Sequence, residues 1–322
     1  MKDQCLKIVK EFLDRYLVDE RPIILAISGG PDSLALLHLM RVCRQFFDMD
    51  LHIAHVDHSL RPESKQEALE LKRYVEKLGL PFHIHTLDGA VKGNLEDWAR
   101  QKRYRYFRAL YQVLEAQALV VGHHLDDQAE TVLKRVLEGA HLHKLGALTP
   151  ESVFHRMRVW RPLLSLSKQE LECWLYQFGA KGFDDATNRD NRYLRARMRQ
   201  LIFPELEKQF GKKIAPTLAR LGERSVELRS YLQRRTRRYF RAIEKTEQEH
   251  KIDLTLFYPL EKVEVMHFLS EWAASLDIML SHSELETLFN LLKMRKAKRE
   301  VGGFIIDRGV ISIFRQIPAY VL

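Results

Sequence analysis

The 322-residue chain has few of the features that stabilise secreted or membrane proteins. It contains only three cysteines, Cys5, Cys43 and Cys173, and no two of them are close in the sequence. We therefore expect neither a disulfide framework nor a cysteine-based zinc or redox centre. Repeats and low-complexity segments are missing, and no apolar run approaches the roughly 20 residues that span a bilayer. We expect no membrane partner.

The N-terminal segment 1–17 lacks the character of a targeting peptide. Its apolar residues recur at helical spacing, but Asp3, Glu11 and Asp14 lie among them. A secretory signal has an apolar centre without charges, and a transit peptide is poor in acidic residues. The segment therefore predicts a surface helix in a cytoplasmic protein.

Acidic residues are fewer than basic ones. The chain has 52 Lys and Arg residues but only 43 Asp and Glu residues, so its net charge is +9. Such an excess favours polyanionic partners. The arginines and lysines gather in segments 189–199, 229–241 and 293–299, with aromatic residues interleaved. This pattern favours a nucleic-acid interface over a merely solvated surface. The aromatic residues are Tyr193, Tyr231, Tyr239 and Phe240, and the candidate substrate-binding arginines are Arg195, Arg197, Arg199, Arg234 and Arg238.

Neither of the two commonest phosphate-binding motifs occurs, since the Walker ending and Gly-x-Gly-x-x-Gly are both missing. Instead, an apolar run at 22–27 leads directly into Ser28-Gly29-Gly30-Pro31-Asp32-Ser33, and an apolar helical pattern follows. Adjacent glycines let the backbone approach a ligand closely. The N–H groups at the start of a helix attract phosphate. The segment predicts a pyrophosphate cradle in which Asp32 can hold Mg²⁺, although an ordinary strand–turn–helix connection is the alternative.

The first half of the chain alternates strands and helices, which predicts an α/β fold with a parallel, Rossmann-like sheet. We expect three parts: a nucleotide-binding catalytic domain at 1–213, a helical linker at 214–250, and a small α+β domain at 251–322. The predicted strands are 22–27, 51–57, 82–86, 118–122, 303–307 and 310–315. The predicted helices are 34–45, 63–78, 94–116, 126–138, 167–178, 214–247, 259–275 and 281–294, and Ser167 with Glu170 suits the start of the fifth.

A second polar segment, His123 to Thr131, follows the fourth predicted strand. Asp126 and Asp127 precede Glu130 by four and three residues, so on a helix their carboxylates lie on neighbouring faces. They either stabilise the helix N-terminus or form a cluster that faces a nucleotide and its metal ion. The histidines show no HExxH spacing, so the sequence does not predict a transition-metal site.

Taken in order, these motifs resemble the tRNA(Ile)-lysidine synthetases, a family of PP-loop ATP pyrophosphatases. The loop Ser28–Ser33 is shared by PP-loop enzymes in general. The more particular matches are segments 55–61, 99–104, 123–131 and 161–164 and the arginine-rich stretch up to Pro204. The resemblance implies a ligase that uses ATP and Mg²⁺ to adenylate the wobble cytidine of tRNA(Ile) with a CAU anticodon. The amine of free L-lysine then attacks carbon 2 of that base and AMP leaves.

The resemblance also assigns roles to residues. Asp32, Arg103 and Glu130 match functional residues of the family. Asp32 would bind magnesium, and Arg103 would stabilise charge on the activated base or its phosphate. Glu130 would help to place the lysine substrate or the metal ion. His124, Asp126 and Asp127 would contact substrate. The chain departs from the family pattern over 138–146, where His141 replaces a glycine and Glu138 reverses a charge, and at Ala196, where an asparagine is common. The domain at 251–322 is a candidate tRNA-binding domain, and a homodimer is a candidate assembly.

The residues allow three alternatives to be weighed against this resemblance. A tRNA thiolase of the same superfamily normally needs paired cysteines, and a glutamine-dependent synthetase needs a glutaminase nucleophile; neither is present in the sequence. An RNA-binding protein with a degenerate nucleotide fold is the non-enzyme alternative, and the altered segment 138–146 is compatible with it.

Overall fold

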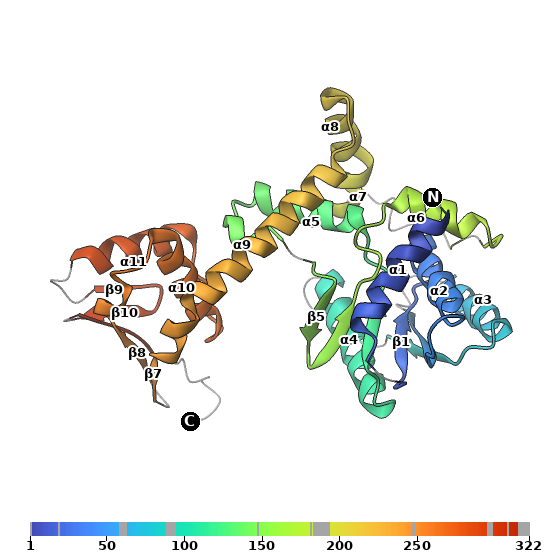
Figure 1. Ribbon diagram of the computed structural model, residues 1–322, viewed down its shortest axis with the longest axis horizontal. Helices are drawn as coiled ribbons and strands as arrows, with labels where there is room; N and C mark the ends of the chain where they lie inside the picture. Colours follow the sequence, from blue (N-terminus) through green and yellow to red (C-terminus); the bar gives the residue numbers. More distant parts are fainter. Residues whose placement is uncertain are drawn as a thin grey trace. The chain divides into compact units, whose positions relative to one another are not determined.

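The computed structural model describes residues 2–18, 20–57, 63–87, 95–146, 148–180, 182, 194–246, 249–294, 299–307 and 309–314. The chain divides into two compact units (Figure 1). The α/β unit comprises Met1–Gly139 and Leu145–Glu223, and the C-terminal unit comprises Ala140–Lys144 and Arg224–Leu322. None of the helices in the described ranges is long and apolar enough to cross a membrane.

The α/β unit is built on a six-stranded sheet with the order β3-β2-β1-β4-β6-β5. All neighbouring pairs are parallel except the hairpin of β5 and β6, which is antiparallel. The predicted parallel α/β fold is therefore confirmed, while the hairpin was not predicted. The strands are β1 (Ile23–Ala26), β2 (Leu51–Asp57), β3 (Phe82–Thr86), β4 (Ala118–Val121), β5 (Glu151–Phe154) and β6 (Met157–Trp160).

Helices pack on both faces of this sheet, and alternate residues of β1 show how. Ile23 and Leu25 belong to one apolar core, which also contains residues of α1, α2 and α6. Ile24 belongs to a second core, which contains Phe107 of α4. A strand covered on both faces needs a continuous apolar sequence, as β1 has. The helices are α1 (Lys2–Tyr16), α2 (Pro31–Cys43), α3 (Ser64–Lys77), α4 (Leu95–Val113), α5 (Leu125–Leu137) and α6 (Lys168–Tyr176).

Short helical segments connect α6 to the long helix α9 (Ala215–Arg241). They are α7 (Leu194–Arg197), a π-helical turn (Met198–Ile202) and α8 (Phe203–Phe210). Gly211 ends α8 in the left-handed region, with a φ of 64°. The prediction that the long helix continues to residue 247 is wrong, since it ends at Arg241 and a strand begins at Glu244.

The C-terminal unit contains a five-stranded antiparallel sheet with the order β7-β8-β11-β10-β9. Its core includes Phe268, Trp272 and Phe304. The predicted helices and the last two strands are present, but β7, β8 and β9 were not predicted. The elements are β7 (Glu244–Lys245), β8 (Glu249–Asp253), a 3₁₀ turn (Leu254–Phe257), α10 (Lys262–Ala274), α11 (His282–Met294), β9 (Arg299–Val301), β10 (Phe304–Asp307) and β11 (Val310–Phe314).

The boundary between the two units in the sequence falls within α9, between Glu223 and Arg224. The sequence instead suggested a boundary at 213/214 and a separate linker over 214–250. The short segment Ala140–Lys144, far earlier in the chain, also belongs to the C-terminal unit. The catalytic and tRNA-binding roles of the predicted parts stay predictions.

The start of α6 provides a stability test, because its predicted capping box is present. The Ser167 hydroxyl accepts a hydrogen bond from Glu170 N at 3.3 Å, and the Glu170 carboxylate accepts one from Ser167 N at 2.8 Å. We expect Ser167→Ala to lower the free energy of unfolding by about 1 kcal/mol, measured by urea denaturation. Ser165→Ala, at an exposed neighbouring serine, is the matched control and should change it little; equal effects would contradict the capping role.

Candidate nucleotide and substrate site

The loop between β1 and α2 is held in shape by its own serines. Ser33 Oγ accepts a hydrogen bond from Gly29 N at 3.1 Å and donates one to Gly30 O at 2.9 Å. Gly29 has a φ of 91°, which only glycine adopts readily. Gly30 caps α2 and Pro31 occupies its first turn. The N–H groups of that turn have no partner within the helix, so the loop is suited to bind phosphate oxygens.

The end of β4 lies directly against this loop. A Cβ atom built on Gly122 would lie 3.4 Å from the carbonyl oxygen of Asp32. Because α5 begins three residues after Gly122, the N-termini of α2 and α5 come together at the carboxyl edge of the sheet. Ligands of open α/β sheets bind at this edge. The two motifs predicted from the sequence therefore form one site.

His124 lies at the centre of the carboxylates of this site, with only 3% of its side chain exposed. Its Nε2 is 3.5 Å from Asp32 Oδ2 and 3.6 Å from Asp127 Oδ2, and its Nδ1 is 3.4 Å from Asp126 Oδ2. Burial alone would lower the pKa of His124, but the carboxylates of Asp126, Asp32 and Asp127 overcome it and raise the pKa to about 10. The ring is thus a buried imidazolium, and it neutralises part of the acidic cluster.

Asp32 has one oxygen that is free to bind a ligand. Burial favours a raised pKa, but His124, Lys168 and Arg199 outweigh it and lower the pKa of Asp32, so the side chain is ionised. Its Oδ1 is buried and has no hydrogen-bond partner among the residues that the structure describes. Mg²⁺ prefers carboxylate oxygens of this kind together with phosphate oxygens and water. The donor set therefore fits a magnesium ion beside a bound nucleotide.

Glu130 is paired with Arg199 of the π-helical turn. Arg199 Nη2 lies 3.1 Å from Glu130 Oε2 and 2.9 Å from Asp127 Oδ1, and Arg199 Nε contacts Glu130 Oε1. Burial raises the pKa of Glu130, although Arg199 opposes the shift. A carboxyl group with a raised pKa can exchange a proton with a substrate amine. Arg199 is therefore part of the charge balance inside the site.

Of the two interpretations of the acidic helix start, stabilisation of the N-terminus of α5 is confirmed at Asp127, while a cluster that faces a nucleotide and its metal ion stays a prediction. Asp127 Oδ2 accepts a hydrogen bond from His124 N at 3.1 Å, so this side chain stabilises the N-terminus of α5. Its other oxygen binds Arg199. Asp126 instead accepts a hydrogen bond from Lys168 N at 2.8 Å and joins the start of α6 to the site.

The opposite side of the site is basic. Arg161 Nε donates to His123 Nδ1 at 3.3 Å, and Arg161 Nη1 is fixed by Thr149 O at 3.0 Å and Ser152 Oγ at 2.9 Å. Burial lowers the pKa of His123 to about 4; Asp127 opposes this shift, while Arg161, Arg195 and Arg103 add to it. His123 is thus a neutral ring near three guanidinium groups. No role for Arg161 or His123 was predicted from the sequence, although both stand in motifs that carry the family resemblance.

The predicted RNA-binding arginines lie in both units. Arg195 and Arg197 are in α7, and Arg195 is exposed. Arg234 and Arg238 are exposed on the part of α9 that belongs to the C-terminal unit, and Arg238 lies 4.7 Å from the centre of the Tyr239 ring. Some residues of the predicted basic clusters lie outside the part of the chain that the structure describes. They are Arg189, Arg192, Tyr193, Arg295, Lys296 and Lys298.

Several residues of the predicted basic surface have other tasks. Tyr239 and Phe240 pack in or against the core of the C-terminal unit, so only Tyr231 of the three described aromatic residues is exposed. Arg235 Nε binds the buried Glu264 at 2.6 Å, and Arg229 Nε donates to the carbonyl oxygen of His143 at 2.9 Å. Sequence spacing cannot reveal these contacts, because the partners are distant in the chain.

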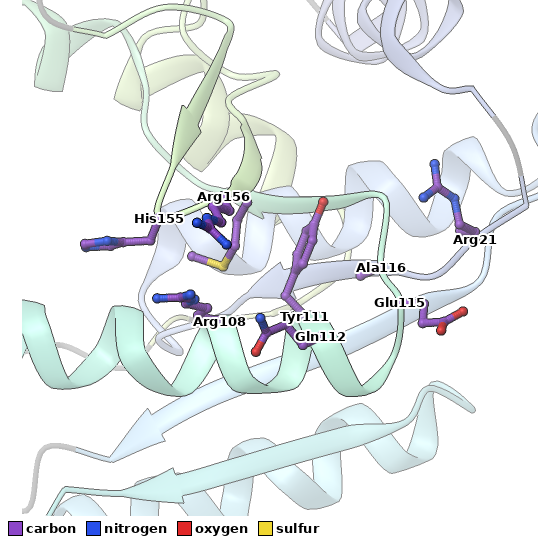
Figure 2. A pocket seen from close by; sticks show the side chains of 9 residues that line it. Arg21, Arg108, Tyr111, Gln112, Glu115, Ala116, His155 and Arg156 are labelled. Atoms are coloured by element: carbon purple, nitrogen blue, oxygen red, sulfur yellow. The ribbon is translucent and has the colours of Figure 1, made fainter.

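A hollow lies elsewhere in the α/β unit. Its volume is about 310 Å³, and Arg21, Arg108, Tyr111 and Arg156 are among the lining residues (Figure 2). Arg21 precedes β1, so this hollow lies at the amino edge of the sheet, opposite the motif residues. The candidate site is identified by its position at the carboxyl edge of the sheet, where ligands of open α/β sheets bind, and not by the volume of a hollow.

Comparisons with known proteins agree with this geometry. The family model of the PP-loop domain matches residues 1–206. The tRNA(Ile)-lysidine synthase of Chlamydia caviae is 33% identical over 97% of this chain and 97% of its own length. The chain belongs to this family of PP-loop proteins. The corresponding synthase of Protochlamydia amoebophila is 39% identical over 69% of this chain, and the match spans about half, 49%, of that relative's length.

A solved structure supports the fold alone. The U34-tRNA thiolase NcsA from Methanococcus maripaludis aligns with a TM-score of 0.58 and 20% identity, over 70% of this chain and 78% of the thiolase chain. The PP-loop fold inferred from the sequence is thereby confirmed.

The buried imidazolium predicts a pH dependence of stability. The pKa of His124 is about 10 in the folded chain against 6.5 as its ordinary value. Its stabilisation is therefore complete below pH 6.5 and is lost as the pH rises to about 10. We expect His124→Asn to lower the free energy of unfolding most below pH 6.5, with a penalty that shrinks toward pH 10. Urea denaturation of both proteins across this range checks it, since titrations that do not depend on His124 cancel in the difference. A constant difference would contradict the shifted pKa.

Proposed function

We propose that the chain is an ATP-dependent ligase that attaches free L-lysine to carbon 2 of the wobble cytidine of tRNA(Ile) with a CAU anticodon. The observation that carries the proposal is the meeting of the Ser28–Ser33 loop with the carboxylates of α5 at one sheet edge. The match to a named tRNA(Ile)-lysidine synthase over nearly its whole length supports the substrate.

The nucleotide is assigned to the loop Ser28–Ser33. Membership of the PP-loop family implies that the protein uses ATP. The N–H groups at the start of α2 would hold the phosphates, and Asp32 Oδ1 would supply an oxygen ligand to Mg²⁺. The bound ion would neutralise the negative charge that collects on the leaving pyrophosphate.

The lysine substrate is assigned to the carboxylate side. Its ε-amine is protonated in water near neutral pH and must lose a proton before it attacks the adenylated base. Glu130 is buried and its pKa is raised, so its carboxylate is a suitable acceptor for that proton. Asp126 and Asp127 extend the negative surface on which the ammonium group would first bind.

The tRNA is assigned to the basic residues. Arg103 and Arg195 are near His123, where a guanidinium can stabilise negative charge on the base or phosphate as the cytidine is activated. Arg197, Arg234 and Arg238 would contact the phosphate backbone. Arg199, which the sequence placed among the tRNA contacts, is instead assigned to holding Glu130 and Asp127. The homodimer and the cytoplasmic location stay predictions.

Incorporation of labelled lysine tests the activity. With ATP, Mg²⁺ and CAU-bearing tRNA(Ile), we expect lysine to enter the tRNA, and Asp32→Ala to lower the turnover at least about 100-fold, as the loss of a key electrostatic contact does. Asp48→Ala, at an exposed carboxylate, is the matched control and should leave turnover unchanged. Near-normal turnover of Asp32→Ala would remove Asp32 from the mechanism. Normal tRNA binding without any incorporation by the parent chain would favour the degenerate RNA-binding protein.

The exposed arginines of α9 test the RNA surface. We expect Arg234→Ala with Arg238→Ala to weaken tRNA binding and to reduce the slope of log K against log salt by about 1 to 2, because each lost phosphate contact removes up to about one unit. The charge-matched control is Lys7→Ala with Arg15→Ala, on exposed positions of α1. Equal slopes for the parent and the α9 variant would make these arginines a solvated face. Arg235 is unsuitable for this test, because its loss leaves the buried Glu264 unpaired.

A further inference from the structure

Two histidines and a glutamate meet inside the C-terminal unit, and His143 belongs to the segment 138–146 that departs from the family pattern. His143 lies in the 3₁₀ turn Leu142–Lys144, while His267 and Glu271 lie one helical turn apart on α10. One potential ligand atom from each of the three lies within 4.8 Å of the others. The rings of His143 and His267 meet edge to face, with their centroids 4.8 Å apart.

Polar atoms of these rings are buried without partners. His143 is 4% exposed and His267 is fully buried. Within the part of the chain that the structure describes, His143 Nε2 and both ring nitrogens of His267 make no hydrogen bond. An unsatisfied buried nitrogen costs about 1 to 3 kcal/mol, so such atoms are rare and need a reason. Burial also lowers the pKa of both histidines, which leaves neutral rings with a lone pair to donate.

We propose that His143, His267 and Glu271 form a site for a divalent transition-metal ion, of which Zn²⁺ fits the ligands best. Imidazole nitrogen and carboxylate oxygen are common zinc ligands, and two histidines with one glutamate is an established zinc set. A histidine and a glutamate four residues apart on one helix present their donor atoms on the same face. The fourth tetrahedral position stays open to water or to a small ligand.

Lys144 and Arg229 contribute positive charge near the site, and Glu271 offsets part of it. Lys144, the nearest cation in sequence, hydrogen-bonds through Nζ to Ser270 Oγ, and Arg229 Nε is engaged by the carbonyl oxygen of His143. Both cations are therefore held by oxygen atoms of the protein, and the Glu271 carboxylate supplies negative charge to the ion. A hollow of about 280 Å³ borders His143 and is lined also by His141, His282 and Met266, so an ion can enter from solvent.

The ion would fasten the segment Ala140–Lys144 to α10. Metal binding to ligands that are distant in the chain adds its free energy to folding, because the unfolded chain has no preformed site. The site lies within one unit and does not depend on the proposed lysine transfer.

Zinc binding to the full chain, stripped with a chelator and without ATP or tRNA, tests the site. We expect one Zn²⁺ per chain after gel filtration, a higher melting temperature with Zn²⁺, and a visible Co²⁺ spectrum of a four-coordinate nitrogen and oxygen site. Glu271→Gln and His267→Ala should weaken Zn²⁺ binding at least about 10-fold, the smallest loss typical even for a supporting group. His282→Ala removes a neighbouring exposed histidine and is the matched control, with binding unchanged.

Two results would overturn the site: a parent chain that retains no Zn²⁺, or a Glu271→Gln variant that binds as the parent does. Glu271 is only half-buried, so Glu271→Gln decides the question even where His267→Ala does not fold. Lysine incorporation by zinc-free protein leaves the site intact as a proposal, since the binding measurement is independent of that activity.

Discussion

The site of this chain depends on the pairing of buried and half-buried carboxylates with two cations, the buried His124 and the half-buried Arg199. Asp127 and Glu130 are nearly removed from water, with Asp32 and Asp126 beside them, and isolated ionised carboxylates there would be strongly disfavoured. His124 is surrounded by three of them and Arg199 binds the remaining one together with Asp127. This mutual neutralisation lets a negatively charged edge exist next to the loop that we propose to bind phosphate. It also means that an incoming cation, whether metal or ammonium, competes with groups already in place.

The same ion pairs connect parts of the chain that are distant in sequence. Arg199 comes from the turn after α7, His124 from the end of β4, and Asp32 from the start of α2. Asp126 reaches further, to the backbone of Lys168 at the start of α6. Electrostatic pairing therefore defines how these termini meet, while the apolar cores on the two sheet faces hold the elements that carry them. Breaking one buried pair leaves a charge without a partner, which costs more than the pair itself contributes.

The sequence allowed the sheet, its crossover helices and the loop Ser28–Ser33 to be predicted, because each has a local signal. Apolar runs that end in glycine or polar residues mark the strands, and the serine–glutamate pair marks the start of α6. The hairpin of β5 and β6 was missed because each strand has four residues and Arg156 and Arg158 interrupt its apolar pattern. Asp32 and Glu130 could be chosen from spacing and resemblance, but the partners of Glu130 could not, since Arg199 is 69 residues away. Likewise, Tyr239 and Arg235 looked like RNA contacts in the sequence, whereas long-range packing places one in the core and pairs the other with Glu264.

The segment Ala140–Lys144 has a consequence for how the chain becomes folded. It belongs to the C-terminal unit, yet its backbone partner Arg229 is 86 residues further along. During synthesis this segment therefore lacks its packing partners, and its histidines stay exposed to solvent, until α9 and α10 have emerged from the ribosome. No single cut in the chain separates the two units cleanly. A fragment that ends before α9 retains these five residues without the surface that covers them.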